Sequence, residues 1–180
     1  PALRTPLAQS LVRGEFALPD EEAQRKFFLL TRQLLLDRGY LHYEISNFAR
    51  GEAFLCRHNR NYWNHTPYLG LGPAAHSFRA GRRWWNFSSV EQYCAVLTAG
   101  QAPLAGSETL TPEQLRLEAL YLGFRTKEGV ALELIQPHPR WQMLLSELEQ
   151  SGLVSLADGR IAATPEGLVV ADRLPLLFVE

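Results

Sequence analysis

Residues 56–77, CRHNRNYWNHTPYLGLGPAAHS, concentrate the side chains of this chain that could do chemistry. The segment holds three of the five histidines, His58, His65 and His76, together with Cys56 and a glycine-rich turn. Imidazole and thiolate groups ligate metals, whereas glycines let a ligand approach the backbone closely. The residue types therefore suit a metal site, a cofactor site or a well-packed loop.

A structural zinc site in this segment would have to combine Cys56, His58 and His65. Zinc sites are usually built from paired Cys-x-x-Cys or His-x(3–5)-His spacings, and the segment contains neither. A loop histidine satisfied by hydrogen bonds is the more frequent arrangement. The spacing therefore ranks zinc last and leaves a packed loop and a cofactor surface open.

The stretch Tyr68–Ala74 predicts a strand that ends in a tight glycine turn. Gly70 and Gly72 carry no side chain, so a cofactor can approach their backbone; plain turn geometry is the alternative. Farther along, two arginines and two tryptophans could clamp carboxylates and stack on a flat ring, although exposed arginines beside buried tryptophans are also common. These four residues are Arg82, Arg83, Trp84 and Trp85.

The composition is that of a globular protein without a large excess of either charge. Of the 180 residues, 46% are hydrophobic and 21% charged, and the formal net charge is −1. These values disfavour disorder and a main role in neutralising phosphates. Residues 41–86 hold six arginines against two glutamates, a balance of +4, whereas residues 111–180 hold ten acids against six bases, a balance of −4. An anionic ligand is expected at the first of these segments.

The cysteine count and the apolar runs bear on the compartment. Cys56 and Cys94 are too few for a disulfide framework, and free thiols indicate a reducing compartment. No apolar run reaches the roughly 18 residues of a membrane span, and residues 1–10 lack the apolar centre of a signal peptide. We expect a cytoplasmic protein without a membrane span. The opening at Pro1, with no initiator methionine, predicts a fragment or processed piece.

The first predicted elements are a helix and a strand that follows it directly. Asp20 caps a helix that ends near Arg38. Tyr40–Ser46 then alternates as a strand whose polar face includes Glu44. Strands beside helices usually belong to parallel sheets buried on both faces, so a polar face predicts a working cavity. An edge strand with one wet face is the alternative.

A hairpin, a helix and a linker are predicted before the end of the first domain. Ser77–Ser89 reads as a hairpin that turns at Ala80-Gly81, and Val90–Leu97 as a short helix. Glycines and a proline mark Thr98–Thr109 as a linker. We place a domain boundary near residue 108, which gives domains of residues 1–107 and 108–180.

The second domain predicts three helical segments, a two-stranded hairpin and a closing helix. Thr111 and Gln114 form a capping box, and Asp158-Gly159 is a strong hairpin signal. This is the order of a winged helix, but its third helix offers one arginine against two glutamates, so nucleic acid is not an expected partner. The segments are Thr111–Phe124, Val130–Ile135, Pro139–Gln150, Leu153–Leu156, Arg160–Ala163 and a helix from Thr164.

Five motifs of the first domain resemble one known family. They are similar to the radical S-adenosylmethionine (SAM) proteins related to oxygen-independent coproporphyrinogen III oxidase, and His58–Trp63 resembles the haem-chaperone branch in particular. The similarity extends to the winged domain, with most of its specificity between Tyr43 and Asn86. The motifs are YEISNFAR (43–50), CRHN (56–59), YW (62–63), YLGLGP (68–73) and AHS (75–77).

The resemblance implies the C-terminal part of an open (β/α) barrel followed by a winged-helix-like domain that covers the site, a combination of α/β and α+β classes. In the family the barrel holds a [4Fe–4S] cluster and SAM. The cluster motif Cys-x-x-x-Cys-x-x-Cys is missing here, and Cys56 and Cys94 lie 38 residues apart, so three irons cannot be held. This chain alone is expected neither to ligate the cluster nor to cleave SAM.

The resemblance also implies roles for individual residues. The turn from Gly70 to His76 becomes part of the wall that faces SAM, with His76 in the contacting position, and His58 becomes the candidate for ligating haem iron. Relatives often have glycine where this chain has Ala74, so a positive φ there would strain the alanine. The expected cofactor-binding residues are Glu44, His58, Tyr62, Trp63, Gly70, Gly72, Ala75, His76 and Arg82.

Haem or a porphyrin is accordingly the expected ligand, because its propionates favour arginine and its iron favours neutral imidazole. We predict the C-terminal portion of a haem-chaperone-like radical SAM protein, which needs an N-terminal half and delivers haem to an apoprotein. The alternatives are the same portion of a true coproporphyrinogen oxidase and an autonomous haem- or protein-binding module without SAM chemistry. A truncated barrel exposes sheet edges, so a homodimer can also form.

Overall fold

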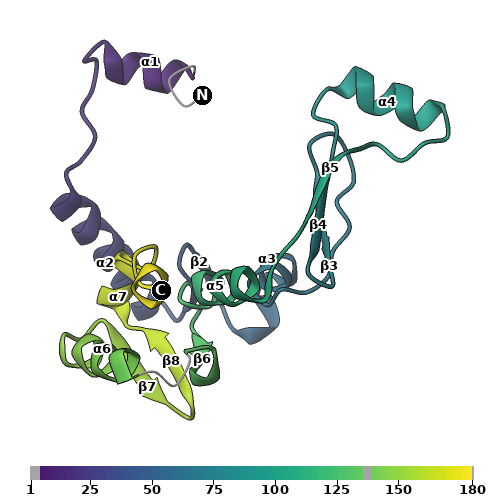
Figure 1. The fold of residues 1–180 in the computed structure, drawn as a ribbon. Coiled ribbons are helices and arrows are strands. Elements are labelled where there is room, and N and C mark those ends of the chain that lie inside the picture. The colour runs from purple at the N-terminus through teal and green to yellow at the C-terminus, as the bar shows by residue number, and fades with distance from the viewer. Residues whose placement is uncertain (1–4, 136–138, 180) are drawn as a thin grey trace.

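The computed structural model describes residues 5–135 and 139–179, in which helices alternate with three small antiparallel sheets (Figure 1). Pro1, on which the expectation of a fragment rests, lies outside the described residues. None of the described helices is long and apolar enough to cross a membrane. The α-helices are α1 (Pro6–Val12), α2 (Glu21–Asp37), α3 (Arg57–Trp63), α4 (Val90–Thr98), α5 (Pro112–Gly123), α6 (Pro139–Gln150) and α7 (Pro165–Val169).

The strands are short and the sheets have two or three strands each. Single 3-10 turns also occur at Glu52–Phe54, Leu132–Leu134 and Pro175–Phe178. The strands are β1 (Leu41–Glu44), β2 (Asn47–Ala49), β3 (His76–Arg79), β4 (Arg82–Asn86), β5 (Leu104–Thr109), β6 (Val130–Ala131), β7 (Val154–Ala157) and β8 (Arg160–Ala163).

Helix α2 begins and ends close to the predicted residues. The Asp20 carboxylate accepts a hydrogen bond from the Ala23 amide at 2.7 Å, which caps the first turn. Its apolar stripe is covered only in part by the described residues: Phe27, Leu30 and Leu34 are 60%, 58% and 48% exposed. The periodicity therefore predicted the helix, but about half of the surface of the face that it defines remains exposed.

The strand after α2 does not join a parallel sheet, which corrects the sequence-based expectation. Residues 45 and 46 turn the chain back, so β1 pairs antiparallel with β2, with a bulge between His42 and Glu44. The imidazole of His42 stacks on Phe48 with ring centroids 4.2 Å apart. Burial lowers the pKa of His42, so its ring is held in the neutral form. Of the polar side chains predicted on this strand, Glu44 is buried, His42 is half-buried and Ser46 is exposed. His42 and Glu44 line a cavity of about 260 Å³.

The outer edge of β1 pairs with the chain that follows α5. The Ile45 amide donates to the Arg125 carbonyl at 2.8 Å, and the Lys127 amide donates to the Tyr43 carbonyl at 3.0 Å. This pairing joins the first half of the chain to the second. It also buries Tyr43, which is 7% exposed.

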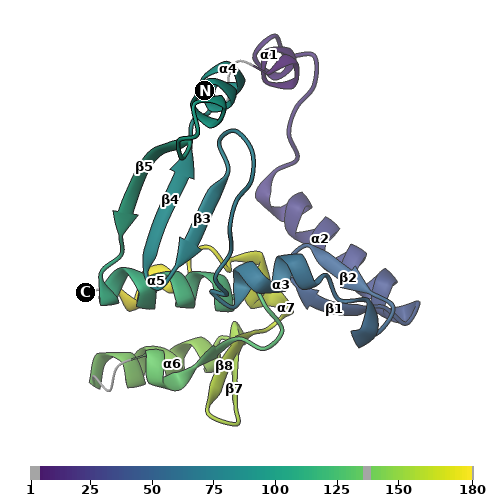
Figure 2. The ribbon, with the colours of Figure 1, turned by 90° about the vertical axis from the view of Figure 1, so that its right-hand side faces the viewer.

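Strands β3, β4 and β5 form one sheet with α4 at its far end. The turn at Ala80-Gly81 is confirmed, with φ of 51° and 75°, values typical of a two-residue I′ hairpin. The predicted linker is wrong in part, because residues 104–109 form β5 along β4. Gly106 permits this pairing: a Cβ there would lie 2.6 Å from a ring carbon of Trp85. Figures 1 and 2 show this sheet on one side of α5, with α6, β7 and β8 on the other.

The continuous hydrophobic core lies in the second half of the chain. The Asp158-Gly159 turn is confirmed, with φ of 50° and 71°, and β8 lies between β6 and β7. The helical segment predicted at Val130–Ile135 is instead strand β6 and a 3-10 turn, because Val130 pairs with Ile161 of β8. The buried core comprises Leu120, Phe124, Val130, Ile135, Trp141, Leu148, Val154, Ile161, Leu174 and Phe178.

Candidate functional site

Helix α3 carries His58, the histidine that the sequence singled out. His58 and Tyr62 are four residues apart on this helix and therefore neighbours on one face. Their rings make an edge contact with centroids 4.9 Å apart, and both side chains are exposed. The imidazole of His58 is thus accessible to a ligand.

The adjacent face of α3 is fixed by a buried carboxylate. Glu44 is 3% exposed and accepts hydrogen bonds from the side chains of Asn47 in β2 and of Asn59 and Trp63 in α3; the bond from Asn59 Nδ2 to Oε1 measures 3.2 Å. A buried carboxylate is tolerated only when hydrogen bonds replace its hydration. Glu44 and Trp63, both expected to bind a cofactor, are therefore occupied with each other.

A cavity of about 430 Å³ lies between α3, the β3–β4 hairpin and α5. We call it the α3–α5 cavity. Four aromatic rings line it, and successive rings lie close: Tyr62 and Tyr68 are 4.7 Å apart, and Tyr68 and Phe78 are 6.3 Å apart. Its lining residues are the aromatic Tyr62, Tyr68, Phe78 and Tyr121, the aliphatic Leu117 and Leu122, and the polar His65, Arg83 and Glu118.

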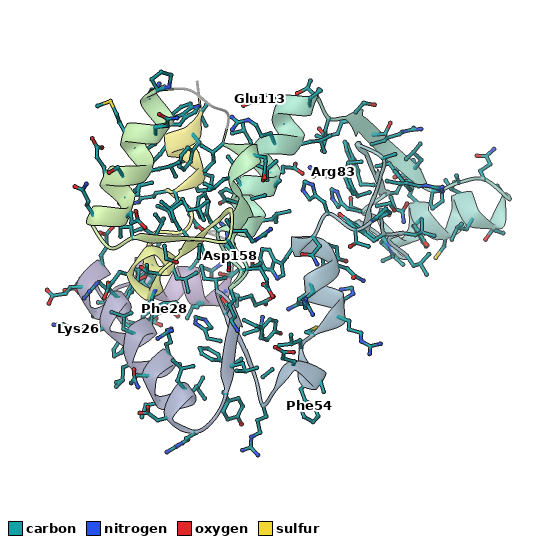
Figure 3. The ribbon with its side chains drawn as sticks, turned by 90° about the horizontal axis from the view of Figure 1, so that it is seen from below. Lys26, Phe28, Phe54, Arg83, Glu113 and Asp158 are labelled. Carbon is teal, nitrogen blue, oxygen red and sulfur yellow. The ribbon has the colours of Figure 1, made fainter. Side chains whose placement is uncertain are left out.

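The polar corner of the α3–α5 cavity is an ion pair that joins the sheet to α5. The Arg83 guanidinium donates to both carboxylate oxygens of Glu118 at 2.7 and 2.8 Å, and Figure 3 labels Arg83 where the sheet meets α5. Hydrogen bonding to Glu118 raises the pKa of Arg83, and burial raises the pKa of the Tyr68 phenol. Arg83 therefore remains charged and Tyr68 neutral.

His65 occupies an unusual backbone position at the end of α3. Its amide donates to the Tyr62 carbonyl and the Thr66 amide donates to the Asn61 carbonyl, the paired bonds of a Schellman motif. Glycine is usual at this left-handed position, but His65 holds it with φ of 51°. Its Nε2 is buried without a hydrogen-bond partner and lies 3.4 Å from Glu118 Oε2.

The sheet divides the other predicted residues between its two faces. Opposite residues of antiparallel strands share a face. His76 therefore lies with Trp85 on the face that also carries Phe78 and Arg83, and the rings of His76 and Trp85 stack with centroids 5.7 Å apart. Arg82 lies on the other face and donates to Ser107 Oγ at 3.3 Å.

A second cavity, of about 400 Å³, lies on the Arg82 face of the sheet. Gly70, Arg82 and Trp84 are among its lining residues. The structure thus places Tyr62 in one cavity, Gly70 and Arg82 in another, and His58 and His76 at exposed positions. The expected cofactor-binding residues do not converge on one point.

The glycine-rich turn is held by the protein's own groups. A Cβ at Gly70 would lie 2.0 Å from the His76 carbonyl oxygen. Glycine therefore lets the backbone at residue 70 pack directly against the backbone of His76. The Asn86 side chain donates to the Gly72 carbonyl at 2.9 Å. Ala74 has φ of 58°, the positive φ that glycine at this position in relatives indicated. Ala75 accepts from the Asn86 amide at 3.0 Å.

The thiol and imidazole groups do not assemble into a metal centre within the described parts of the chain. No group of three or more His, Cys, Asp or Glu side chains there could hold a metal ion. Cys56 and Cys94 are both free and exposed. The residues present therefore do not fit a [4Fe–4S] cluster, which requires three thiolates from one site.

Comparison with known proteins gives the family context. Residues 110–170 match the HemN C-terminal domain. The chain is 33% identical over 174 residues to the haem chaperone HemW of Mycobacterium tuberculosis, covering 94% of this chain and 43% of that protein. It is 28% identical to bovine mitochondrial radical S-adenosyl methionine domain-containing protein 1, covering 96% of this chain and 42% of that protein.

The solved structure of coproporphyrinogen III oxidase (HemN) from Escherichia coli, a radical SAM enzyme, aligns with a TM-score of 0.64. The alignment covers 89% of this chain and 42% of that one at 18% identity, which defines a shared mixed α and β fold. The chain spans less than half the length of these relatives. It belongs to the HemN-like haem-chaperone family of radical SAM proteins, of which it represents the C-terminal portion.

We predict that Glu44→Gln loosens α3. The amide nitrogen that replaces one carboxylate oxygen is a donor, and it would face one of the three side-chain donors that now bond to Glu44. A buried polar group left without a partner costs about 1–3 kcal/mol. The free energy of unfolding, measured by urea denaturation, should fall by that amount. Glu52→Gln, the same change at an exposed site, should alter it by less than about 0.5 kcal/mol. Equal effects of the two changes would refute a special role for Glu44.

We also predict that Ala74→Gly stabilises the protein by roughly 1 kcal/mol, because glycine adopts the left-handed conformation without the Cβ clash. The matched change Ala95→Gly, at an exposed position inside α4, should destabilise it by about 0.5–1 kcal/mol. Thermal unfolding of both variants measures the difference. A lower melting temperature for Ala74→Gly would contradict the strain argument.

Proposed function

We propose that this chain is the haem-handling C-terminal portion of a HemW-like haem chaperone and binds haem or a porphyrin on the exposed face of α3. The observation that carries the proposal is the His58–Tyr62 pair: an accessible imidazole is in ring contact with Tyr62, which lines the α3–α5 cavity. Neutral imidazole ligates haem iron, and aromatic walls suit a flat ring.

The chaperone is favoured over a true oxidase by the comparisons. Relatives named as haem chaperones align at up to 36% identity, whereas the oxidase structure shares the fold at 18% identity. The His58–Trp63 motif supports the same branch. The proposal includes delivery of the bound haem to an apoprotein. It also places the protein in the cytoplasm, a reducing compartment that suits the free thiols.

The proposed architecture is the end of an open barrel in residues 1–107 and a winged-helix-like domain in residues 108–180. The boundary is supported by the buried core, whose members all lie between Leu120 and Phe178. The half-exposed stripe of α2 supports a partner for the first part, namely the N-terminal half found in longer relatives. In isolation, open strand edges favour pairing of two copies.

The turn from Gly70 to His76 is proposed to face SAM in the longer proteins. His76 is exposed and Gly72 has φ of 103° with open space beside it, so this part of the turn can contact a ligand. The cluster that activates SAM in radical SAM proteins needs thiolates that this chain does not supply.

We expect haem to bind with a shifted Soret band and His58→Ala to weaken that binding by roughly tenfold or more, equivalent to about 1.4 kcal/mol. Absorbance titration measures the effect. His76→Ala, which removes another exposed imidazole, should leave the spectrum unchanged. A wild-type spectrum in His58→Ala would remove His58 from the haem site.

We further expect no [4Fe–4S] cluster after anaerobic reconstitution of this chain with iron and sulfide, because two separate exposed cysteines cannot hold three irons. Iron analysis and electron paramagnetic resonance of the reduced sample give the readout. A stoichiometric cluster signal would contradict this expectation, and Cys56→Ser and Cys94→Ser would then show whether these thiols ligate it.

A further inference from the structure

The α3–α5 cavity has the size and lining of a binding site for a flat organic ligand. Its volume of about 430 Å³ falls within the roughly 300–1,000 Å³ of small-molecule pockets. Aromatic side chains from three separate segments face it: Tyr62 and Tyr68 around the end of α3, Phe78 from β3 and Tyr121 from α5. The lining is thus mainly apolar, with charge confined to one corner.

At the charged corner, Arg83 contacts two carboxylates, one of them weakly. Arg83 is bound through two short bonds to Glu118, but its contact with Glu108 is 3.3 Å long and the Glu108 side chain is 46% exposed. A carboxylate on a ligand could replace Glu108 at Arg83 without disturbing the pair with Glu118. Arginine is well suited to such an exchange because its fork offers five donors.

His65 marks the same corner independently of the ion pair. A histidine stands in a left-handed position that glycine usually fills, and its Nε2 is buried without a hydrogen-bond partner beside Glu118. Backbone outliers and unsatisfied buried groups gather at functional sites. Both features lie against the wall of the α3–α5 cavity.

We infer that the α3–α5 cavity binds the apolar ring system of a tetrapyrrole, with a ligand carboxylate at Arg83. This inference rests on the function proposed above and adds to it a location and a consequence. Because ring stacking and the carboxylate contact involve no metal, the cavity recognises metal-free porphyrin as well as haem. Two of its walls come from β3–β4 and α5, so the ligand contacts both halves of the chain.

The test is a fluorescence titration of the full chain with metal-free protoporphyrin. Leu122→Trp places an indole in the cavity and should weaken binding roughly tenfold or more. Leu30→Trp, the same change on the exposed face of α2, should bind like the wild type. Tyr68→Leu removes one ring but keeps apolar bulk, and should weaken binding severalfold, so the test does not depend on one variant's folding.

The outcomes separate this inference from the proposed function. A folded Leu122→Trp variant that binds protoporphyrin like the wild type overturns the cavity site, even if haem binding through His58 stands. A wild-type chain that binds haem but not protoporphyrin also overturns it. A chain that binds neither ligand refutes both the proposed function and the cavity site.

Discussion

The arrangement of the candidate site depends on the buried carboxylate of Glu44. Removing a carboxylate from water is costly, and here the cost is offset by donors from β2 and from two turns of α3. Because Asn59 and Trp63 are held inward, His58 stays exposed and Tyr62 lies at the α3–α5 cavity. The same strand that carries Glu44 pairs with the chain after α5, so one short segment orients α3 and joins the two halves.

The sheet β3–β4–β5 separates the α3–α5 cavity from the cavity on the Arg82 face. Arg82 and Arg83 are adjacent in sequence, but strand geometry sends their side chains to opposite faces. Arg83 therefore meets Glu118 at the α3–α5 cavity, whereas Arg82 belongs to the cavity on the other side. A ligand that contacts one of these arginines on its face does not reach the other.

The fold partly neutralises the uneven charge of the sequence by pairing its basic and acidic segments. The basic excess of residues 41–86 meets the acidic excess of residues 111–180 in the pair between Arg83 and Glu118, with His65 beside it. The basic segment therefore has less free charge for an anionic ligand than its composition indicates. At this corner Arg83 keeps its short bonds to Glu118, whereas its longer contact with Glu108 is the one that a ligand carboxylate would replace. Such a contact is more selective than a generally positive surface.

Local signals in the sequence determined the elements that short-range forces control. Asp20 and Thr111 cap their helices, the Ala80-Gly81 and Asp158-Gly159 turns form the predicted hairpins, and the motif residues identified the family. The left-handed Ala74 could also be anticipated, because a glycine is common there among relatives.

Tertiary structure alone decided which of these elements meet. The helix α3 lacks a capping signal that hydrogen-bonds its first turn and is held instead by Glu44, thirteen residues before it. The strand β5 forms because Gly106 lets Trp85 lie across it. The walls contributed by Leu117, Glu118 and Tyr121 follow from α5 packing beside α3. Periodicity and turn chemistry act over a few residues, whereas hydrogen bonds and packing between distant segments place the cavity.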